Sequence, residues 1–309
     1  MPLEPVRGLP TAAAALAVLS LLGCGSAQEA EGTAAEGSPS PSASVDPASY
    51  TPDLEALAKE YDTRLGVYAL DTATGAEVSF NADERFAYAS THKAFSAGAV
   101  LAANSMAELE EEVPIEEGDL LPESHSPVVQ EHVGSTMTLL EICDAAVRFS
   151  DNSAANLLFE ELGGPEGLDA ALEELGDDVT HVDRVEPDLS EGTPGDIRDT
   201  STPEAMATTL RAYALGDALP EEKRDILVDM LKRSVTGDAL IRAGVPEGWE
   251  VGDKSGTADY GGRNDIAVVW PEEGGPIVMA VMTRQDDTED EPHDALVAEA
   301  AEVAAGALR

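Results

Sequence analysis

The order of strand and helix signals constrains the fold of this chain more than any other feature. Strand signals occur only near the two ends of its folded part, at residues 64–71, 76–80, 252–257, 264–270 and 277–284. Between them, apolar residues recur at helical spacing. We therefore expect an α/β plus all-α architecture, in which residues 50–82 and 232–309 build one α/β domain and residues 83–231 form an inserted helical domain.

The N-terminal residues resemble an export signal followed by a tether. Residues 1–23 hold an apolar run too short to span a bilayer, and the run ends in Leu21-Leu-Gly-Cys24, which resembles the lipobox of bacterial lipoproteins. We expect lipidation at Cys24, with ordinary secretion as the alternative. Residues 24–49 lack bulky apolar side chains and are expected to form a disordered tether. The sequence thus predicts an exported protein of the cell envelope, lipid-anchored or secreted.

The charge of the chain excludes several classes of partner. It has 18 basic and 61 acidic residues, giving a net charge of −43, so nucleic acid and anionic lipid headgroups would be repelled. Membrane contact is expected only through the lipid anchor. The five histidines form no pair with metal-ligand spacing, and no glycine-rich phosphate loop is present, so neither a metal nor a cofactor is expected.

The two cysteines are not expected to form a disulfide. If Cys24 carries a lipid, Cys143 has no partner. Cys143 lies on the apolar stripe of a helix that begins at the capping box Thr138-Leu-Leu-Glu141. We interpret it as a buried core thiol.

Ser90-Thr-His-Lys93 is the first candidate for chemistry. On a helix, Ser90 and Lys93 lie about one turn apart on one face, within hydrogen-bond reach. A lysine can accept the serine proton only where burial or a nearby positive charge lowers its pKa. The alternative is a helix start with a solvated lysine.

Three further stretches do not indicate a function when each is considered alone. Ser150-Asp-Asn152 is a common helix cap, Glu186 lies in a loop rich in charge, proline and glycine, and Lys254-Ser-Gly256 is a common turn. Together with Ser90 and Lys93, and in this order, the serine-and-lysine motifs form a known acyl-transfer set.

On these motifs the chain resembles the class A serine β-lactamases along residues 50–309. Asn156, Asp199, Thr202-Pro203, Trp249 and Arg263 support the resemblance. It implies a β-lactamase-like two-domain fold, an antiparallel sheet flanked by helices with an inserted helical domain. The active site would lie in the cleft between the domains, and the substrate would be a small β-lactam.

The resemblance also implies the catalytic roles. Ser90 attacks the lactam carbonyl, and either Lys93 or Glu186, acting through a water, takes its proton. Ser150 relays a proton to the departing nitrogen. Glu186 activates the water that hydrolyses the acyl-enzyme.

Other residues would bind substrate or support the site. Asn152 would bind the side-chain amide of the substrate, and its carboxylate would be held by Lys254, Ser255, Thr257 and Arg263. Arg184 and Asp199 would pair across the base of the Glu186 loop, and Asn156 would support that loop.

Two positions depart from the family pattern, and a third, His125, has two open interpretations. Ser190 stands where the family usually has an asparagine that helps to position the hydrolytic water. Ala258-Asp259 follows Thr257 where many members have a glycine first. His125 occupies a position where the family usually has an aromatic residue that forms a gate. Its side chain would either contact the substrate or simply be exposed in a loop.

Two other functions remain open on the sequence alone. One is a penicillin-binding D-Ala-D-Ala peptidase of the same superfamily, which would not need the Glu186 loop. The other is a sensor lipoprotein that binds β-lactams or cell-wall fragments without turnover, and Ser190 favours it. A monomer is expected in each case.

Overall fold

The computed structural model describes residues 45–121 and 123–309. The predicted signal peptide, Cys24 and all but the last residues of the predicted tether lie outside this part of the chain. The tether was predicted to reach residue 49, but the short 3₁₀ helix η1 (Pro47–Ser49) already belongs to the ordered structure. Val45 packs beside the apolar cluster that contains Tyr50, so the folded part includes residues that were predicted to belong to the tether.

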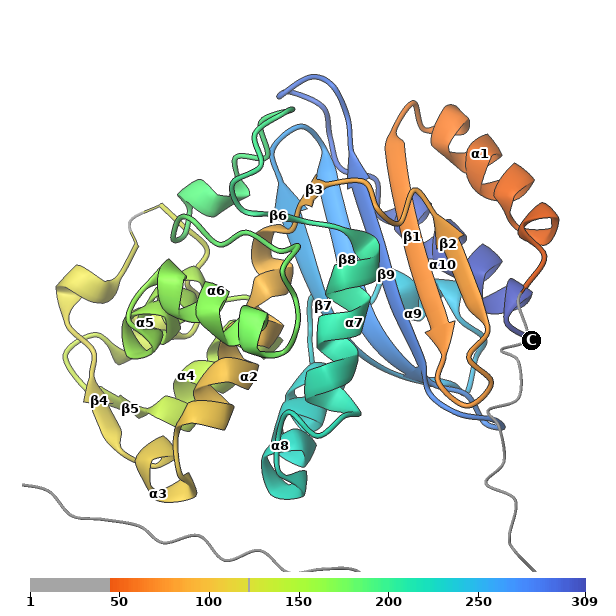
Figure 1. The fold of residues 1–309 in the computed structure, drawn as a ribbon. Helices are drawn as coiled ribbons and strands as arrows, with labels where there is room; N and C mark the ends of the chain where they lie inside the picture. Colours follow the sequence, from red (N-terminus) through yellow and green to blue (C-terminus); the bar gives the residue numbers. More distant parts are fainter. Residues whose placement is uncertain (1–44, 122) are drawn as a thin grey trace, which may run out of the picture. The chain divides into compact units, whose positions relative to one another are not determined.

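One five-stranded antiparallel sheet contains residues from both ends of the chain (Figure 1). Its strands are β1 (Arg64–Asp71), β2 (Glu77–Phe80), β7 (Glu250–Ala258), β8 (Gly262–Trp270) and β9 (Ile277–Arg284). Their order is β2-β1-β9-β8-β7, and β1 pairs with β9 along its whole length. The predicted fold class, an antiparallel sheet flanked by helices with a helical insertion, is confirmed.

Both faces of this sheet are apolar. Ile266 and Val268 belong to one buried cluster, whereas Ala267 and Val269 belong to another. Because successive side chains of a strand point to opposite faces, helices must cover both sides. The helices α1 (Thr51–Glu60) and α10 (Asp294–Ala307) contribute to the second cluster, and α7 (Pro203–Ala214) contributes to the first (Figure 1).

The helix α7 packs both on the sheet and against the helices α2 (Lys93–Ala103) and α8 (Glu221–Lys232). This helix falls inside the predicted helical insertion, 83–231, yet its first residue packs on the sheet. A Cβ added at Gly66 of β1 would lie 2.8 Å from Pro203 Cγ and 2.6 Å from Phe86 Cε2. The second apolar face of the sheet requires such a cover, which helical periodicity alone does not assign.

Several of the remaining helices pack around the helix α2, which is buried from Lys93 to Leu101. The other helices are α3 (Met106–Leu109), α4 (Leu139–Arg148), α5 (Asn152–Leu162), α6 (Pro165–Glu174), α8 (Glu221–Lys232) and α9 (Ile241–Gly244). The short strands are β3 (Phe86–Ala87), β4 (Glu112–Pro114), β5 (Thr136–Thr138) and β6 (Thr200–Ser201), and the short 3₁₀ helices are η2 (Ala89–His92), η3 (Glu117–Asp119), η4 (Val129–His132) and η5 (Asp188–Ser190).

The predicted capping box before α4 is confirmed. Thr138 Oγ1 accepts the backbone N–H of Glu141 at 3.1 Å, and the Glu141 carboxylate accepts that of Thr138 at 2.8 Å. Cys143 follows on the inner face of α4 and is fully buried. The prediction of a core thiol is therefore confirmed.

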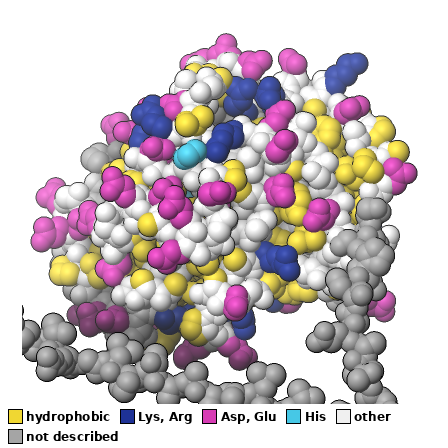
Figure 2. Space-filling model, in the orientation of Figure 1, with side chains coloured by type: hydrophobic (Ala, Val, Ile, Leu, Met, Phe, Trp, Pro, Cys, Tyr) yellow, Lys and Arg dark blue, Asp and Glu magenta, His cyan; other side chains and the backbone are white. Residues whose placement is uncertain are grey.

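The surface is rich in acidic side chains, which Figure 2 shows spread over the visible face. Among the described residues, no helix has the length and apolar character needed to cross a membrane.

Candidate active site

Ser90 lies in η2, at the point where the chain passes from β3 into α2. The pairing of β3 with β6 fixes the approach to this turn, and Ala89 just before Ser90 has a positive φ of 48°. A non-glycine residue in this region is uncommon and occurs preferentially at functional sites. The backbone thus presents Ser90 at one fixed place.

Lys93 is fully buried and reaches toward Ser90. Its Nζ donates to Ser90 Oγ at 2.8 Å and to the carbonyl oxygen of Ser150 at 3.0 Å, and it also contacts Asn152 Oδ1. Its salt-bridge distance to Glu186 Oε1 is 2.9 Å. Burial lowers the pKa of Lys93, and the negative charge of Glu186 opposes this shift. This is the situation in which a lysine can exchange a proton with a hydroxyl.

Ser150 and Asn152 come from the turn between α4 and α5. Ser150 has a φ of 56°, and its Oγ accepts a hydrogen bond from Lys254 Nζ at 2.9 Å. Asp151 holds this turn, because its buried carboxylate accepts backbone N–H groups of Val128, Val129 and Ala154. The interpretation of Ser-Asp-Asn as a helix cap is confirmed, since Asp151 is the N-cap of α5. Its neighbours Ser150 and Asn152 line the cavity.

The edge strand β7 forms the opposite wall. Lys254 is fully buried, and its pKa is lowered to about 7 by burial and by the charge of Lys93, against the opposing effect of Asp253 and Asp265. Gly256 permits the close approach of η2, because a Cβ there would lie 2.8 Å from the carbonyl oxygen of Tyr88.

On the same wall, Ser255 and Arg263 are held by residues that the sequence motifs did not identify. Ser255 Oγ donates to Thr236 Oγ1 at 2.7 Å. Arg263 donates from Nη1 to Thr257 Oγ1 at 3.0 Å and from Nε to Asp294 Oδ1 at 2.6 Å. Neither Thr236 nor Asp294 lies in a recognisable motif.

Glu186 is buried, and hydrogen bonds to its backbone hold it in place. Asn156 accepts from the N–H of Glu186 at 2.9 Å and donates to its carbonyl oxygen at 3.0 Å. Burial raises the pKa of Glu186, but the charge of Lys93 and the contacts of His92 and Lys93 outweigh it, and the pKa falls to about 2. Its side chain is therefore a carboxylate at neutral pH.

The base of the Glu186 loop is closed by Arg184 and Asp199. Arg184 Nε donates to Asp199 Oδ2 at 2.5 Å, and Arg184 also pairs with Glu191. Asp199 Oδ1 accepts the backbone N–H groups of Asp183 and Arg184 at 2.9 and 3.0 Å and the hydroxyl of Tyr88 at 3.3 Å. The loop is thereby joined to the segment that precedes Ser90.

The structure brings most of the predicted site residues around one cavity of about 360 Å³. Its walls are Ser90, His125, Ser150, Asn152, Glu186, Pro187, Ser190, Thr236, Ser255, Gly256, Thr257 and Arg263. Lys93 and Lys254 donate hydrogen bonds to the wall residues Ser90 and Ser150. Asn156, Arg184 and Asp199 support the Glu186 loop through the contacts described above. Cys24 lies outside the described residues.

Two of the three positions noted in the sequence, His125 and Ser190, line this cavity. His125 is exposed, and its Nε2 is 3.0 Å from the carbonyl oxygen of Phe149. The carbonyl oxygen of Ser190 accepts the backbone N–H of Asp259 at 3.0 Å. This bond connects the Glu186 loop to the residues that follow β7.

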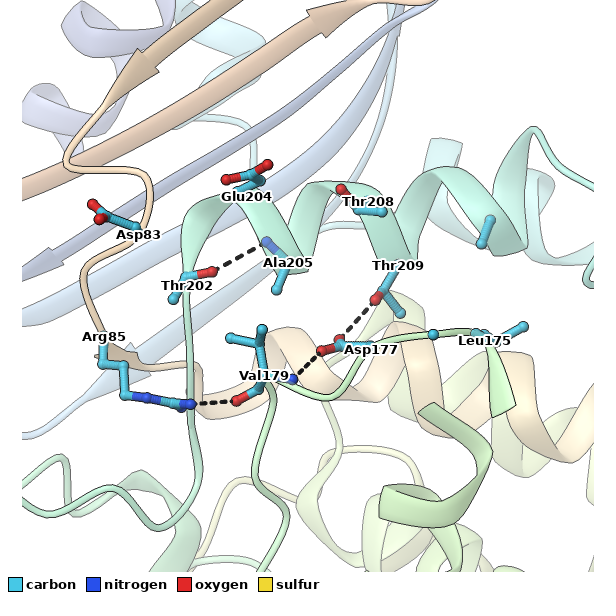
Figure 3. A pocket seen from close by; sticks show the side chains of 12 residues that line it. Asp83, Arg85, Leu175, Asp177, Val179, Thr202, Glu204, Ala205, Thr208 and Thr209 are labelled. Atoms are coloured by element: carbon cyan, nitrogen blue, oxygen red, sulfur yellow. Dashed lines mark hydrogen bonds between the residues drawn. The ribbon is translucent and has the colours of Figure 1, made fainter. Parts of the chain in front are cut away.

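A second hollow of about 440 Å³ lies between α7 and residues 175–179 (Figure 3). The carboxylate of Asp177 on its wall accepts from Val179 N at 3.1 Å and from Thr209 Oγ1 at 2.8 Å. Arg85 donates to the carbonyl oxygen of Val179 at 2.7 Å. The Thr209–Asp177 bond joins α7 to the segment that leads into the Glu186 loop, and the Arg85 bond joins that segment to the residue before β3. We therefore interpret these bonds, drawn in Figure 3, as structural support.

No group of three or more His, Cys, Asp or Glu side chains in the described part of the chain could hold a metal ion.

Comparison with known proteins gives a consistent result. A family model described as the β-lactamase enzyme family matches residues 50–308. A β-lactamase of Amycolatopsis lactamdurans is 53% identical over 270 residues, covering 87% of this chain and 89% of that protein. The solved structure of a class A β-lactamase from Clostridium kluyveri DSM 555 has a TM-score of 0.82 and 47% identity, covering 84% of this chain and 98% of that one. The crystal structure of a halotolerant bacterial β-lactamase has a TM-score of 0.80 and 50% identity, covering 82% and 96%.

Proposed function

The chain belongs to the class A serine β-lactamases, and we propose that it opens the β-lactam amide through an acyl-enzyme on Ser90, which a water activated by Glu186 then hydrolyses. One observation carries this mechanism. The Nζ of buried Lys93 lies 2.8 Å from Ser90 Oγ and 2.9 Å from Glu186 Oε1. The nucleophile Ser90 therefore lies beside two groups that can accept its proton, Lys93 and Glu186.

In the acylation step, Ser90 Oγ attacks the lactam carbonyl as its proton leaves. Lys93 can take this proton directly if it starts neutral, and Glu186 can take it through a water. The backbone N–H groups of Ser90 and Thr257 would form the oxyanion hole. The loss of one such donor costs about 3 kcal/mol of transition-state stabilisation.

The departing nitrogen needs a proton when the amide bond breaks. Ser150 Oγ is suited to donate it, because Lys254 Nζ at 2.9 Å can replace the proton that the hydroxyl gives up. The lowered pKa of Lys254, about 7, brings this ammonium close to the range in which it can transfer a proton at neutral pH.

Substrate recognition is assigned to the walls on either side of Ser90. Lys254, Ser255, Thr257 and Arg263 on β7 and β8 would hold the substrate carboxylate through charge and hydroxyl donors. Asn152 on the opposite wall would bind the side-chain amide of the substrate, and exposed His125 would contact the side chain at the cavity entrance.

Hydrolysis of the acyl-enzyme is assigned to Glu186. Its pKa of about 2, lowered chiefly by the charge of Lys93, keeps it ionised at neutral pH, which is the form that can accept a proton from water. Asn156 fixes its backbone, and Arg184 with Asp199 closes its loop. Ser190 lines the same cavity and would contact the water in place of the usual asparagine.

Export, lipid attachment at Cys24 and a monomeric state complete the proposal. The sequence Leu21-Leu-Gly-Cys24 supports lipidation, with secretion as the alternative.

The mechanism is tested by following ring opening of a penicillin together with the acyl-enzyme mass. We expect sustained turnover that is lost in Ser90→Ala, and an acyl-enzyme that accumulates in Glu186→Ala. Normal turnover by Glu186→Ala would refute the role of Glu186. A stoichiometric burst by the wild type with a persistent adduct would instead favour a non-hydrolytic sensor.

A further inference from the structure

His92 lies between the nucleophile and the buried lysine in sequence, and none of the proposed steps uses it. Its side chain is 2% exposed. The imidazole stacks on Phe159 with ring centroids 5.1 Å apart and an angle of 18°, and it is tilted against Tyr88 at 5.8 Å. Its Nδ1 is 3.0 Å from Ser96 Oγ. These contacts fix the plane of the ring.

The other ring nitrogen of His92 is directed at Glu186. Its Nε2 lies 3.6 Å from Glu186 Oε1, and within the described residues this buried atom has no hydrogen-bond partner. A separation of 3.6 Å is too long for a hydrogen bond, yet a buried polar atom without a partner is costly. The ring therefore faces a carboxylate that needs to move by only about half an ångström to bond with it.

The surroundings indicate which nitrogen carries the proton. Burial lowers the pKa of His92, the charges of Lys93 and Lys254 act in the same direction, and Glu186 opposes them, so the ring is neutral at pH 7. If Nδ1 carried the proton, the lone pair of Nε2 would face the carboxylate. Because the Ser96 hydroxyl can donate to Nδ1, the favourable tautomer is the one with the proton on Nε2.

We propose that His92 is a positioning residue for hydrolysis of the acyl-enzyme, with its Nε2–H donating a hydrogen bond to Glu186 Oε1 once Ser90 is acylated. In the free enzyme Ser90 Oγ lies 3.4 Å from Glu186 Oε1 and can donate to it. The ester oxygen of the acyl-enzyme has no proton and cannot. Glu186 then needs another donor, and His92 is already aimed at it.

This second donor matters because the Glu186 carboxylate has few other anchors. Among the described residues, its only side-chain hydrogen-bond and ion-pair partners are Ser90 and Lys93, and His92 lies 3.6 Å away. The bonds of Asn156 go to the backbone of Glu186 and leave the carboxylate free to rotate. Without His92, Lys93 alone would hold the base while it receives a proton from water.

The proposal rests on the assignment of Glu186 as the base for hydrolysis, and the test uses two substitutions of His92. His92→Phe keeps the stack on Phe159 but removes both nitrogens, whereas His92→Gln restores an N–H donor near the position of Nε2. Acylation and deacylation rates are measured separately, by single-turnover kinetics with a penicillin and by decay of the acyl-enzyme mass.

For His92→Phe we expect deacylation to slow about tenfold, the effect of losing one hydrogen bond to a charged acceptor, while acylation changes less than about twofold. The acid limb of kcat should move to higher pH, because the lost donor had stabilised ionised Glu186. His92→Gln should recover most of the loss. Equal slowing of both steps, or unchanged deacylation in a folded His92→Phe, would overturn the proposal.

A measurement on the wild-type protein keeps the test independent of folding defects. Proton–nitrogen correlation spectra of the imidazoles, with the His92 signals assigned by their absence in His92→Gln, should show the proton on Nε2 throughout the active pH range. A proton on Nδ1 would also overturn the proposal. If Glu186→Ala turned over normally, the assignment of Glu186 would fail instead, and the two failures are therefore distinguishable.

Discussion

Replacing Asp199 with asparagine should weaken the fold and the site together. The Asp199 carboxylate is fully buried and accepts four hydrogen bonds, two from backbone N–H groups, one from Tyr88 and one from Arg184. Asparagine keeps the volume and one acceptor oxygen. Its NH₂ group must, however, face a donor, either the guanidinium of Arg184 or the pair of backbone N–H groups.

The expected magnitude follows from these contacts. Removing one member of a buried ion pair costs about 3–5 kcal/mol of unfolding free energy. Arg184 is 16% exposed and keeps Glu191 as a second partner, so its charge is not left isolated. We therefore expect Asp199→Asn to cost about 2–3 kcal/mol, which lowers the Tm of a protein of this size by about 4–12 °C.

Asp199→Asn should also slow the reaction, because Glu186 lies two residues after Arg184 in the same loop. A loosened loop base lets the Glu186 carboxylate leave its position, whereas Ser90 and Lys93 remain fixed by η2 and α2. Deacylation should therefore slow more than acylation, and the acyl-enzyme should accumulate during turnover. Thermal unfolding and mass spectrometry of the reacting enzyme measure the two effects.

Asp196→Asn is the matched control. Asp196 pairs with Arg198 in the same loop, but Arg198 is half exposed, so the pair contributes little to stability. This variant should melt close to the wild type and show no accumulated acyl-enzyme. If Asp199→Asn behaved like Asp196→Asn, the loop base would not hold Glu186 as argued.

Three further predictions concern single groups. The kcat/KM for anionic substrates should fall as pH rises through about 7, because Lys254 loses its proton there, and Lys254→Arg should move this limb to higher pH; a flat alkaline profile would contradict it. Asp294→Asn should lower KM about two- to threefold in steady-state assays, because Asp294 competes with the substrate carboxylate for Arg263; an unchanged KM would contradict that competition. Cys143, whose pKa burial raises, should react with a thiol reagent only after unfolding, with Cys143→Ala as the blank; rapid labelling of the native protein would contradict its burial.

The sequence predicts elements well where one signal dominates. The strand 277–284 has the predicted bounds in the structure, because a continuous apolar run flanked by turn residues identifies a central strand. The place of α7 could not be predicted in this way. Its amphipathic pattern shows that one face is buried, but the choice between the sheet and other helices depends on tertiary packing.

The same distinction applies to the cavity. Ser90, Ser150 and Lys254 carry motif signals, and the structure places them in one hydrogen-bonded cluster with Lys93. Thr236 and Asp294 have no local signal, because their contacts arise only when β7, β8 and α10 pack in register.

The chain as a whole is strongly acidic, whereas two lysines lie buried beside its cavity, and burial explains how both persist. The net charge of −43 acts mainly from solvated side chains, whose fields are screened within about 8 Å at physiological salt. Lys93 and Lys254 are fully buried, where screening is weak, and each is balanced by nearby carboxylates. We therefore expect an anionic substrate that reaches Ser90 to interact mainly with the charged groups of the cavity, Lys93 and Lys254 among them. The close packing of β7 against η2, which Gly256 permits, brings Lys254 near Ser90, and we expect that the acidic surface does not prevent an anionic substrate from binding there.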